Sequence, residues 1–239
     1  MLRAAIFDMD GLLVDSEPVW REVEVEVFGR HGVPVTPERC IETKGMFLGE
    51  AVDYWYARHP WPAPSTAHVA REIVDAMALR LAAGVARKEG VAHALAFCRA
   101  RGVRLALASS SPRQVIEAVV QGAGLSGSFA VVHSAEDEVA GKPDPAVFLT
   151  TARLLGVAPA ACVVFEDSPA GVRAAKAAGM ACVAVPEDDP VSVAAHGGAR
   201  SSGFAPADVV LGSLAELDEA VWAACARAAG VSGREAPSG

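Results

Sequence analysis

Residues 4–11 of the chain read AAIFDMDG, and this stretch decides how the rest of the sequence is interpreted. Four apolar residues in a row predict a short buried strand, and Asp8 and Asp10 follow directly where that strand ends. Most isolated Asp-x-Asp pairs are solvated turn residues or helix caps, but an unpaired carboxylate beside a buried strand is costly. Gly11 allows a tight turn, and ligands of open α/β sheets bind at the carboxyl ends of strands. The stretch therefore predicts a strand that ends in a candidate ligand site.

Five further apolar runs along the chain also predict buried strands. They are continuous rather than alternating, as expected for a parallel sheet covered by helices on both faces. Helices fill most of the gaps, and Ser111-Pro112, Asp144-Pro145 and Ser168-Pro169 predict helix starts in which a capping residue precedes a proline. This order predicts the α/β class, with a Rossmann-like doubly wound parallel sheet as the core. The predicted strands cover residues 4–7, 103–108, 130–132, 162–165, 182–185 and 209–211.

One long segment, residues 14–103, departs from this alternation because it contains no convincing strand. Helical patterns fill it instead, and the prolines within residues 59–64 predict a rigid turn between two of the helices. We therefore expect a small all-helical domain inserted after the first strand. The predicted helices cover residues 17–30, 48–58, 66–82 and 91–101, and the last of them leads back to the sheet.

The expected domain boundaries follow from this insertion. Hinges are expected near Asp15 and Gly84, although Asp15 and Ser16 also suit a simpler role as caps of the first inserted helix. We favour capping for Ser16 and both roles for Asp15. The α/β core is predicted at residues 1–14 and 84–230, the helical domain at 15–83, and a disordered tail of small and polar residues at 231–239.

Composition and charge exclude several classes of function. The formal net charge of the 239 residues is -8, and an acidic surface repels phosphodiester backbones, so nucleic acid is not an expected partner. No apolar run approaches the ~18 residues of a membrane span, and the first residues do not fit a signal peptide. The five cysteines are odd in number and form no Cys-x-x-Cys pair, which favours reduced thiols over disulfides or structural zinc. We expect a cytoplasmic monomer.

Two acidic residues at a second predicted strand end favour a metal site. Glu166 and Asp167 follow the strand at 162–165, as Asp8 and Asp10 follow the first strand. Carboxylates that meet at one edge of a sheet offer the oxygen ligands that Mg²⁺ prefers. The alternative is that Asp167 or Ser168 only caps the following helix.

A third and a fourth strand end carry a hydroxyl and a cation. Ser109 and Ser110 follow the strand at 103–108 beside a predicted helix start, where hydroxyls and helix amides suit an anion. Lys142 lies between a glycine and a proline in a rigid turn. Serine runs are common in ordinary loops and a turn lysine is usually solvated, so these two signals gain weight only from their position beside the carboxylates.

Together the motifs resemble the haloacid dehalogenase-like hydrolase superfamily, with its order D-x-D-G-x-x-x-D-S, then S, then K, then E-D. Asp15 and Ser16 complete the first motif, and the resemblance covers nearly the whole chain. It implies that Asp8 is a nucleophile that becomes an aspartyl-phosphate, and that Asp10 is a general acid and then a base. It also implies that Ser109, with Ser110 next to it, and Lys142 hold the phosphoryl group. The implied ligands of Mg²⁺ are Asp8, the carbonyl of Asp10, Asp167 and, directly or indirectly, Glu166.

Asp10 distinguishes between reactions within that superfamily. Dehalogenation releases halide, which needs no proton, and the branch that performs it lacks the second acid. The phosphonate-cleaving branch also departs at this position. With Asp10 present, the resemblance implies phosphate transfer from an oxygen leaving group.

The helical insert resembles the superfamily's cap, which closes over the site and contacts the substrate. Trp20 and Lys44 are the cap residues expected to contact it, although Trp20 also suits simple packing within the cap. The sugar phosphomutase branch has a histidine in place of Trp20 and an arginine in place of Leu48, which help it grip a second phosphate, so this chain fits a phosphatase better. A closer resemblance, to the bacterial 2-deoxyglucose-6-phosphatase group, also called the hexitol phosphatase B group, is carried by residues 5–20, 53–61 and 166–180.

The resemblance implies a Mg²⁺-dependent phosphatase that acts on a small phosphorylated metabolite, such as a hexose or hexitol phosphate. The alternatives are a sugar phosphomutase similar to β-phosphoglucomutase and a catalytically silent metabolite-binding module. The complete set of motif residues argues against the silent module, because binding alone needs no nucleophile. Within the cap, Trp55 and Trp61 would either face a sugar ring or pack in the cap's own core.

Overall fold

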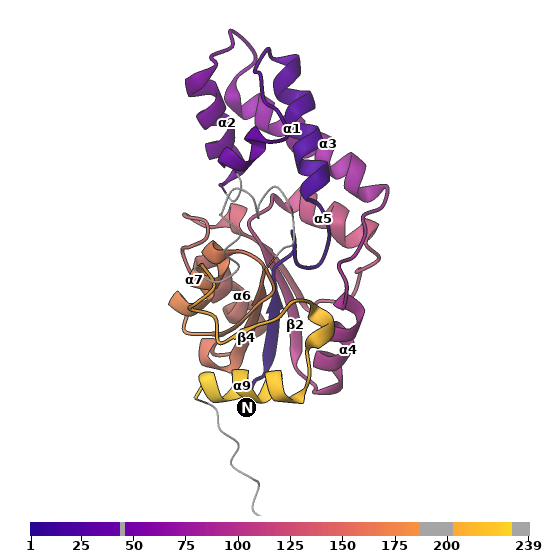
Figure 1. Ribbon diagram of the computed structural model, residues 1–239, viewed down its shortest axis with the longest axis vertical. Coiled ribbons are helices and arrows are strands. Elements are labelled where there is room, and N and C mark those ends of the chain that lie inside the picture. Colours follow the sequence, from indigo (N-terminus) through magenta and orange to yellow (C-terminus); the bar gives the residue numbers. More distant parts are fainter. Residues whose placement is uncertain (44–45, 187–202, 231–239) are drawn as a thin grey trace, which may run out of the picture.

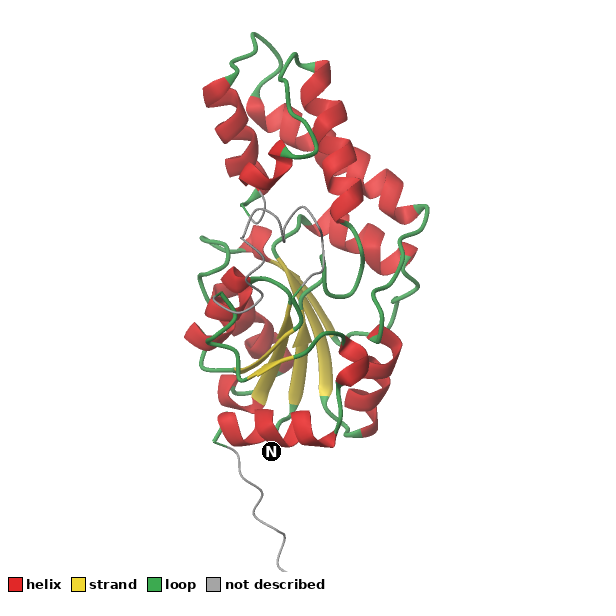
Figure 2. Cartoon of the chain, in the orientation of Figure 1, coloured by secondary structure: helices red, strands yellow, loops and turns green. Residues whose placement is uncertain are grey.

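The computed structural model describes residues 1–43, 46–186 and 203–230. Lys44, with its predicted substrate contact, and the predicted disordered tail at 231–239 lie outside the described residues. Figures 1 and 2 show a twisted sheet flanked by helices, with a separate group of helices standing beyond one end of the strands.

A six-stranded parallel sheet with the order β3-β2-β1-β4-β5-β6 forms the centre of the molecule, which confirms the predicted α/β class. Successive residues of a strand point to opposite faces, so Ala5 and Phe7 join one hydrophobic core while Ala4 and Ile6 join the other. Both faces are buried, which explains the continuous apolar runs. The strands are β1 Ala4–Phe7, β2 Arg104–Ser109, β3 Val131–Ser134, β4 Cys162–Glu166, β5 Ala181–Ala184 and β6 Val209–Val210.

Helices cover both faces of the sheet. Buried residues of α4, α5 and α9 join the core that contains Phe7, and those of α6 and α7 join the core that contains Ile6. From β1 the chain adds β2 and β3 on one side of the sheet and then β4, β5 and β6 on the other. Doubly wound sheets bind ligands at the point where the strand order reverses in this way. These helices are α4 Val91–Ala100, α5 Arg113–Gly122, α6 Ala146–Leu155, α7 Pro169–Ala177 and α9 Glu219–Ala228, with 3-10 turns at η2 Ala135–Asp137, η3 Pro159–Ala161 and η4 Leu214–Glu216.

The inserted helices form a group with its own apolar interior. They are α1 Glu17–Arg30, η1 Arg39–Thr43, α2 Leu48–Arg58 and α3 Thr66–Ala82, close to the predicted ranges. Trp55 and Trp61 are buried in this interior, and the indole of Trp61 donates to the carbonyl of Pro64. Among the described residues, neither tryptophan lines the cavity at the site, so the core role is the one that the structure supports for both.

The two chain segments that connect the sheet to the inserted helices run side by side. Val14 and Arg87 form an antiparallel bridge, and the amide of Asp15 donates to the carbonyl of Ala86 at 3.1 Å. A second contact joins the insert to the core, because α3 packs along α5 and Gln114 donates to Asp75 at 3.0 Å. The insert thus contacts the core at the paired crossing and along α3, and Phe47, just before α2, also packs against the core beside Gly141.

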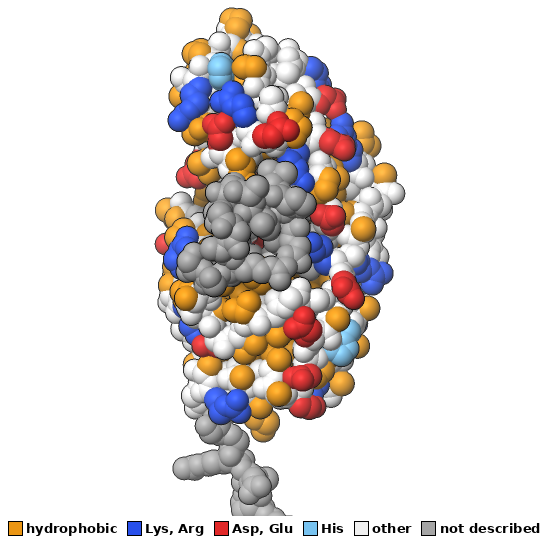
Figure 3. Space-filling view, viewed as in Figure 1, with side chains coloured by type: hydrophobic (Ala, Val, Ile, Leu, Met, Phe, Trp, Pro, Cys, Tyr) orange, Lys and Arg blue, Asp and Glu red, His pale blue; other side chains and the backbone are white. Residues whose placement is uncertain are grey.

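The surface on one face carries charges of both signs, and the cysteines are buried. On the face shown in Figure 3, acidic and basic side chains are interspersed rather than gathered by sign. All five cysteines lie in the described part of the chain, and all are buried and free of disulfides. No helix within the described ranges is both long and apolar enough to cross a bilayer.

Candidate active site

A cavity of about 660 Å³ lies between the carboxyl ends of β1, β2 and β4 and the inserted helices. Loops that follow three neighbouring strands converge there because the strands are parallel and in register. Every predicted site residue that the structure describes lines this cavity: Asp8, Asp10, Trp20, Ser109, Ser110, Lys142, Glu166 and Asp167.

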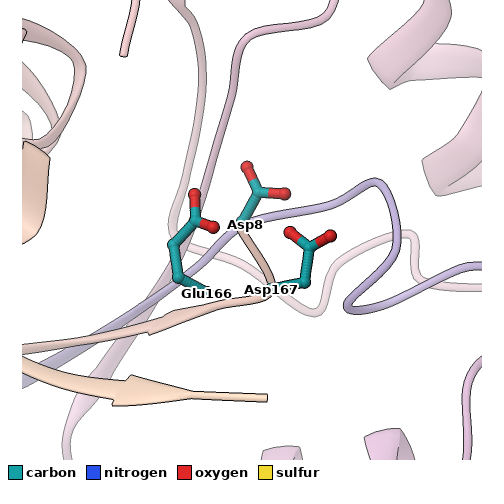
Figure 4. Close-up of side chains that lie close together, drawn as sticks. All are labelled: Asp8, Glu166 and Asp167. Carbon is teal, nitrogen blue, oxygen red and sulfur yellow. The ribbon is translucent and has the colours of Figure 1, made fainter. Parts of the chain in front are cut away.

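Lys142 and two carboxylates form a buried ionic cluster at the base of the cavity. The Lys142 ammonium donates to Oδ1 of Asp8 and to Oε1 of Glu166, both at 2.5 Å, and all three side chains are at most 8% exposed. Asp167 adds a third carboxylate, and Asp8, Glu166 and Asp167 each offer an oxygen within 4.8 Å of the others. Figure 4 shows these three groups pointing the same way from the ends of β1 and β4.

Burial and neighbouring charges shift the pKa values of the groups in this cluster. Burial raises the pKa of Asp8 to about 7, while Lys142 opposes the shift and Glu166 adds to it. Burial alone would lower the pKa of Lys142, but Asp8 and Glu166 together hold it above its usual value. The closely spaced oxygens of Asp8, Glu166 and Asp167 are ligands that a hard divalent cation prefers. The donor set therefore fits Mg²⁺.

Asp10 is held by a hydrogen-bond network of its own. The hydroxyl of Ser16 donates to Oδ1 at 2.5 Å, and the hydroxyl of Ser111 donates to Oδ2 at 2.6 Å. Weaker contacts at 3.4 Å come from the Ser109 hydroxyl and the Trp20 indole. Because partners from β2, its following loop and α1 all reach the same carboxyl, Asp10 is fixed close to Asp8 and faces the cavity.

Two predictions about helix caps were wrong, and both concern this network. Ser16 precedes α1 but makes no side-chain capping bond, and Ser111 does not cap α5, which begins only at Arg113. Each hydroxyl bonds Asp10 instead, because a charged, partly buried acceptor forms a stronger hydrogen bond than a helix amide that water can solvate. Ser168, in contrast, caps α7 as predicted, accepting from the amide of Gly171 at 3.0 Å.

Glu166 is fully buried and its position is set from two sides. Its Oε2 accepts from the amide and the hydroxyl of Ser168, while its Oε1 accepts from Lys142. Gly171, in the first turn of α7, leaves room for the carboxylate, since an added Cβ would lie 1.7 Å from Oε1. The helix cap and the acidic cluster are therefore one connected unit.

Comparison with known proteins places this site in a family. Residues 2–179 match the model of a family described as haloacid dehalogenase-like hydrolase. The chain belongs to the haloacid dehalogenase-like hydrolase family. It is similar to hexitol phosphatase B of Escherichia coli K12, with 41% identity over 90% of this chain and 93% of that protein. It is also similar to the phosphorylated carbohydrates phosphatase of Thermotoga maritima, with 33% identity over 75% of this chain and 82% of that protein.

A solved structure of the same family agrees with the fold. The chain is similar to CbbY from Rhodobacter sphaeroides in complex with phosphate, with a TM-score of 0.78, 30% identity, and coverage of 90% of this chain and 96% of that one. The family match and the two phosphatase relatives identify the chain as an enzyme of the phosphatase type.

Sequence reasoning missed three contributors to this haloacid dehalogenase-like site. Ser111 contacts Asp10 more closely than Ser109 does, and Ser16 contacts it closest of all. Gly171 was not singled out, although a glycine in the first turn of a helix, three residues after a capping serine, signals that something needs its space. Ser110 lines the cavity, and its predicted contact with phosphate stays a prediction.

Substituting Gly171 tests how tightly Glu166 must be placed. In Gly171→Ala the new methyl group would overlap the carboxylate, so Glu166 must move away from Lys142 and Asp8. We expect activity to fall about 10- to 100-fold, as is usual when a group that supports a metal site is disturbed. The measurement is the rate of phosphate release at rising Mg²⁺ concentration.

Gly49→Ala is the matched control, because Gly49 lies in α2 and nothing approaches its added Cβ within 4 Å. Alanine is the better helix former by about 1 kcal/mol, so neither variant should lose helix stability. Wild-type activity and Mg²⁺ dependence in Gly171→Ala would show that the placement of Glu166 is unimportant.

Proposed function

We propose that the enzyme is a Mg²⁺-dependent phosphatase that hydrolyses phosphate monoesters of small sugars or sugar alcohols through a phosphoryl group carried by Asp8. The observation that carries the proposal is the meeting of Asp8, Lys142 and Asp10 in one cavity, with two further carboxylates beside them. The similarity to proteins named for hexitol phosphates and phosphorylated carbohydrates supports the substrate class.

Asp8 is the proposed nucleophile in the first of two displacements. One of its carboxylate oxygens bonds the phosphorus while the bond from phosphorus to the ester oxygen breaks. Asp10 protonates that leaving oxygen, which departs as an alcohol. In the second displacement Asp10 removes a proton from water as the water oxygen bonds the phosphorus, and Asp8 is released as a carboxylate. Each turnover consumes one monoester and one water and releases one alcohol and one phosphate.

Positive charge is needed because a carboxylate and a phosphate dianion repel each other. Asp8, Glu166 and Asp167 would hold Mg²⁺, together with the backbone carbonyl of Asp10, and the cation would supply charge that stabilises the transferring phosphoryl group. Lys142, in contact with Asp8, provides a second positive charge, and Ser109 and Ser110, which line the cavity, would donate to phosphoryl oxygens.

We also propose that residues 15–83 act as a cap over a core of residues 1–14 and 84–230. The paired crossing at Val14 and Arg87 supports a hinge there, since both chain segments that connect the two parts pass through it. Closure would exclude bulk water from the aspartyl-phosphate until the alcohol has left. We further expect the enzyme to be cytoplasmic. We also expect it to be a monomer, and size-exclusion chromatography would test that oligomeric state.

A panel of phosphate monoesters, assayed with Mg²⁺ for phosphate release, tests the proposal. We expect turnover of hexitol and hexose 6-phosphates, and no release from any member of the panel would refute a phosphatase. The alternative phosphomutase would convert a sugar 1-phosphate to the 6-phosphate without net release. Leu48 disfavours it, because it places an apolar side chain in the cavity where the mutase branch has an arginine.

Removing divalent metal is expected to abolish phosphate release and to lower thermal stability. The carboxylates of Asp8, Glu166 and Asp167 would then lack their cation. Because a ligand present at 100 times its Kd stabilises the native state by about 2.7 kcal/mol, loss of the metal should lower the melting temperature. The measurement is the melting temperature with EDTA and with Mg²⁺, alongside activity. Asp167→Asn should show a smaller Mg²⁺-dependent rise in melting temperature. An equal rise would show that Asp167 does not bind the metal.

A further inference from the structure

One stripe of helix α1 forms a polar wall of the cavity above the catalytic carboxylates. Glu17, Trp20, Arg21 and Glu24 all line the cavity, and their spacing of three and four residues places them on a single helix face. In Figure 1, α1 leads away from the sheet, so residues later in the helix lie farther from the strand ends. Glu24 is therefore the member of the stripe most distant from Asp8.

Trp20 serves as the reference point for how far Glu24 lies from the reacting atoms. The Trp20 indole donates to Asp10, the group that would protonate the leaving oxygen. Glu24 follows Trp20 by one helical turn, which is a rise of about 6 Å. A substrate whose ester oxygen lies at Asp10 would need several more carbon atoms to reach Glu24. A hexitol or hexose chain has that length, and glycerol phosphate does not.

The surroundings of Glu24 make it unusual for a helix carboxylate. Its side chain is partly buried, and burial raises its pKa to about 7, with Glu17 adding to the shift and a hydrogen bond from the Cys40 thiol opposing it. A thiol is a weak donor, and a carboxylate has about four lone-pair directions to satisfy. Glu24 thus faces the cavity with hydrogen-bonding capacity left, at a place where water would be displaced by a bound substrate.

The wall formed by the rest of the insert is different in character. Ile41, Met46, Leu48 and Ala51, from η1, α2 and the segment before α2, present apolar side chains to the same cavity. One polar and one apolar wall suit a molecule with hydroxyl groups and a carbon skeleton.

We propose that Glu24 is a specificity-determining residue that accepts hydrogen bonds from hydroxyl groups at the end of the substrate remote from the phosphate. The inference rests on the proposed phosphatase function and adds to it the chemistry of the distal group, a neutral polyol end. Arg21 and Glu17 line the cavity on the same stripe, closer to the start of α1. Glu24 touches no reacting atom, so it acts on substrate choice and not on the displacement steps.

The test compares a long polyol phosphate with a short one in two Glu24 variants. The quantity measured is the ratio of kcat/KM for a hexitol 6-phosphate to kcat/KM for glycerol 3-phosphate, with Mg²⁺ present. We expect Glu24→Ala to lower this ratio about 10- to 100-fold, mainly through a higher KM for the hexitol ester, as is usual for lost hydrogen bonds to a charged group. Glu24→Gln keeps the size and part of the hydrogen bonding, so its ratio should fall less.

Glu22→Ala is the matched control, since Glu22 lies on the same helix with a side chain that is 71% exposed and points to Arg80 rather than the cavity. An unchanged ratio in Glu24→Ala, with an active wild type, would overturn the inference and leave the phosphatase function standing. If the wild type released no phosphate from any monoester, the proposed function itself would fail, and the inference with it.

Discussion

Replacing Asp8 with asparagine is expected to lower kcat/KM by about 10⁴-fold or more, because the amide oxygen is a poor nucleophile and no other group replaces it. The change removes one negative charge from a buried cluster in which Lys142 still has Glu166 as a partner. The fold should therefore survive. The measurements are steady-state phosphate release and the melting temperature, with the same Mg²⁺ concentration for both proteins.

Asp53→Asn is the control for this substitution. Asp53 lies on the exposed side of α2, outside the cavity, so the same chemical change there should leave kcat/KM within a factor of two, or about 0.4 kcal/mol. Turnover by Asp8→Asn close to that of the wild type would contradict the mechanism, because no step of it proceeds without the Asp8 carboxylate.

Replacing Asp10 with asparagine is expected to separate the two displacements. An alkyl phosphate needs a proton on its leaving oxygen, so hydrolysis of a hexitol phosphate should slow by about 10²- to 10⁴-fold. p-Nitrophenyl phosphate has a good leaving group that needs no proton, so its first displacement should persist. The second displacement lacks its base with either substrate, and the phosphorylated enzyme should accumulate.

Rapid mixing of Asp10→Asn with p-nitrophenyl phosphate should thus give a burst of nitrophenolate, close to one per enzyme molecule, followed by slow turnover. One of the Ser16 and Ser111 hydroxyls can still donate to the amide oxygen of asparagine, and the other can rotate to accept from its amide nitrogen, so the local geometry should be kept. Equal slowing of both substrates without a burst would show that Asp10 only positions other groups.

Much of the fold could be predicted because local signals agreed with the tertiary structure. The continuous apolar runs predicted strands buried on both faces, and β1 has that character because Phe7 and Ile6 face opposite cores. Ser168-Pro169 predicted the start of α7 correctly, since the serine caps the helix. The convergence of Asp8, Lys142 and Glu166 followed from the rule that parallel strands end at one edge.

The parts that could not be predicted depend on contacts between distant segments. Ser16 and Ser111 each stand before a helix and read as caps, and nothing local shows that Asp10 attracts both hydroxyls. Glu24 reads as an ordinary charged position on an amphipathic helix until the cavity beside it is known. The space that Gly171 leaves for Glu166 is likewise invisible without the fold, because it depends on where β4 ends relative to α7.

The central claim is that phosphate passes through a covalent bond to Asp8, and one measurement tests it directly. Asp10→Asn is mixed with p-nitrophenyl phosphate and Mg²⁺, quenched with acid during the burst, digested and analysed by mass spectrometry. The mechanism predicts one added phosphoryl group on the peptide that contains Asp8, located on that aspartate and absent from Asp8→Asn. A burst with no phosphorylated peptide, or with the phosphoryl group on another residue, would contradict it.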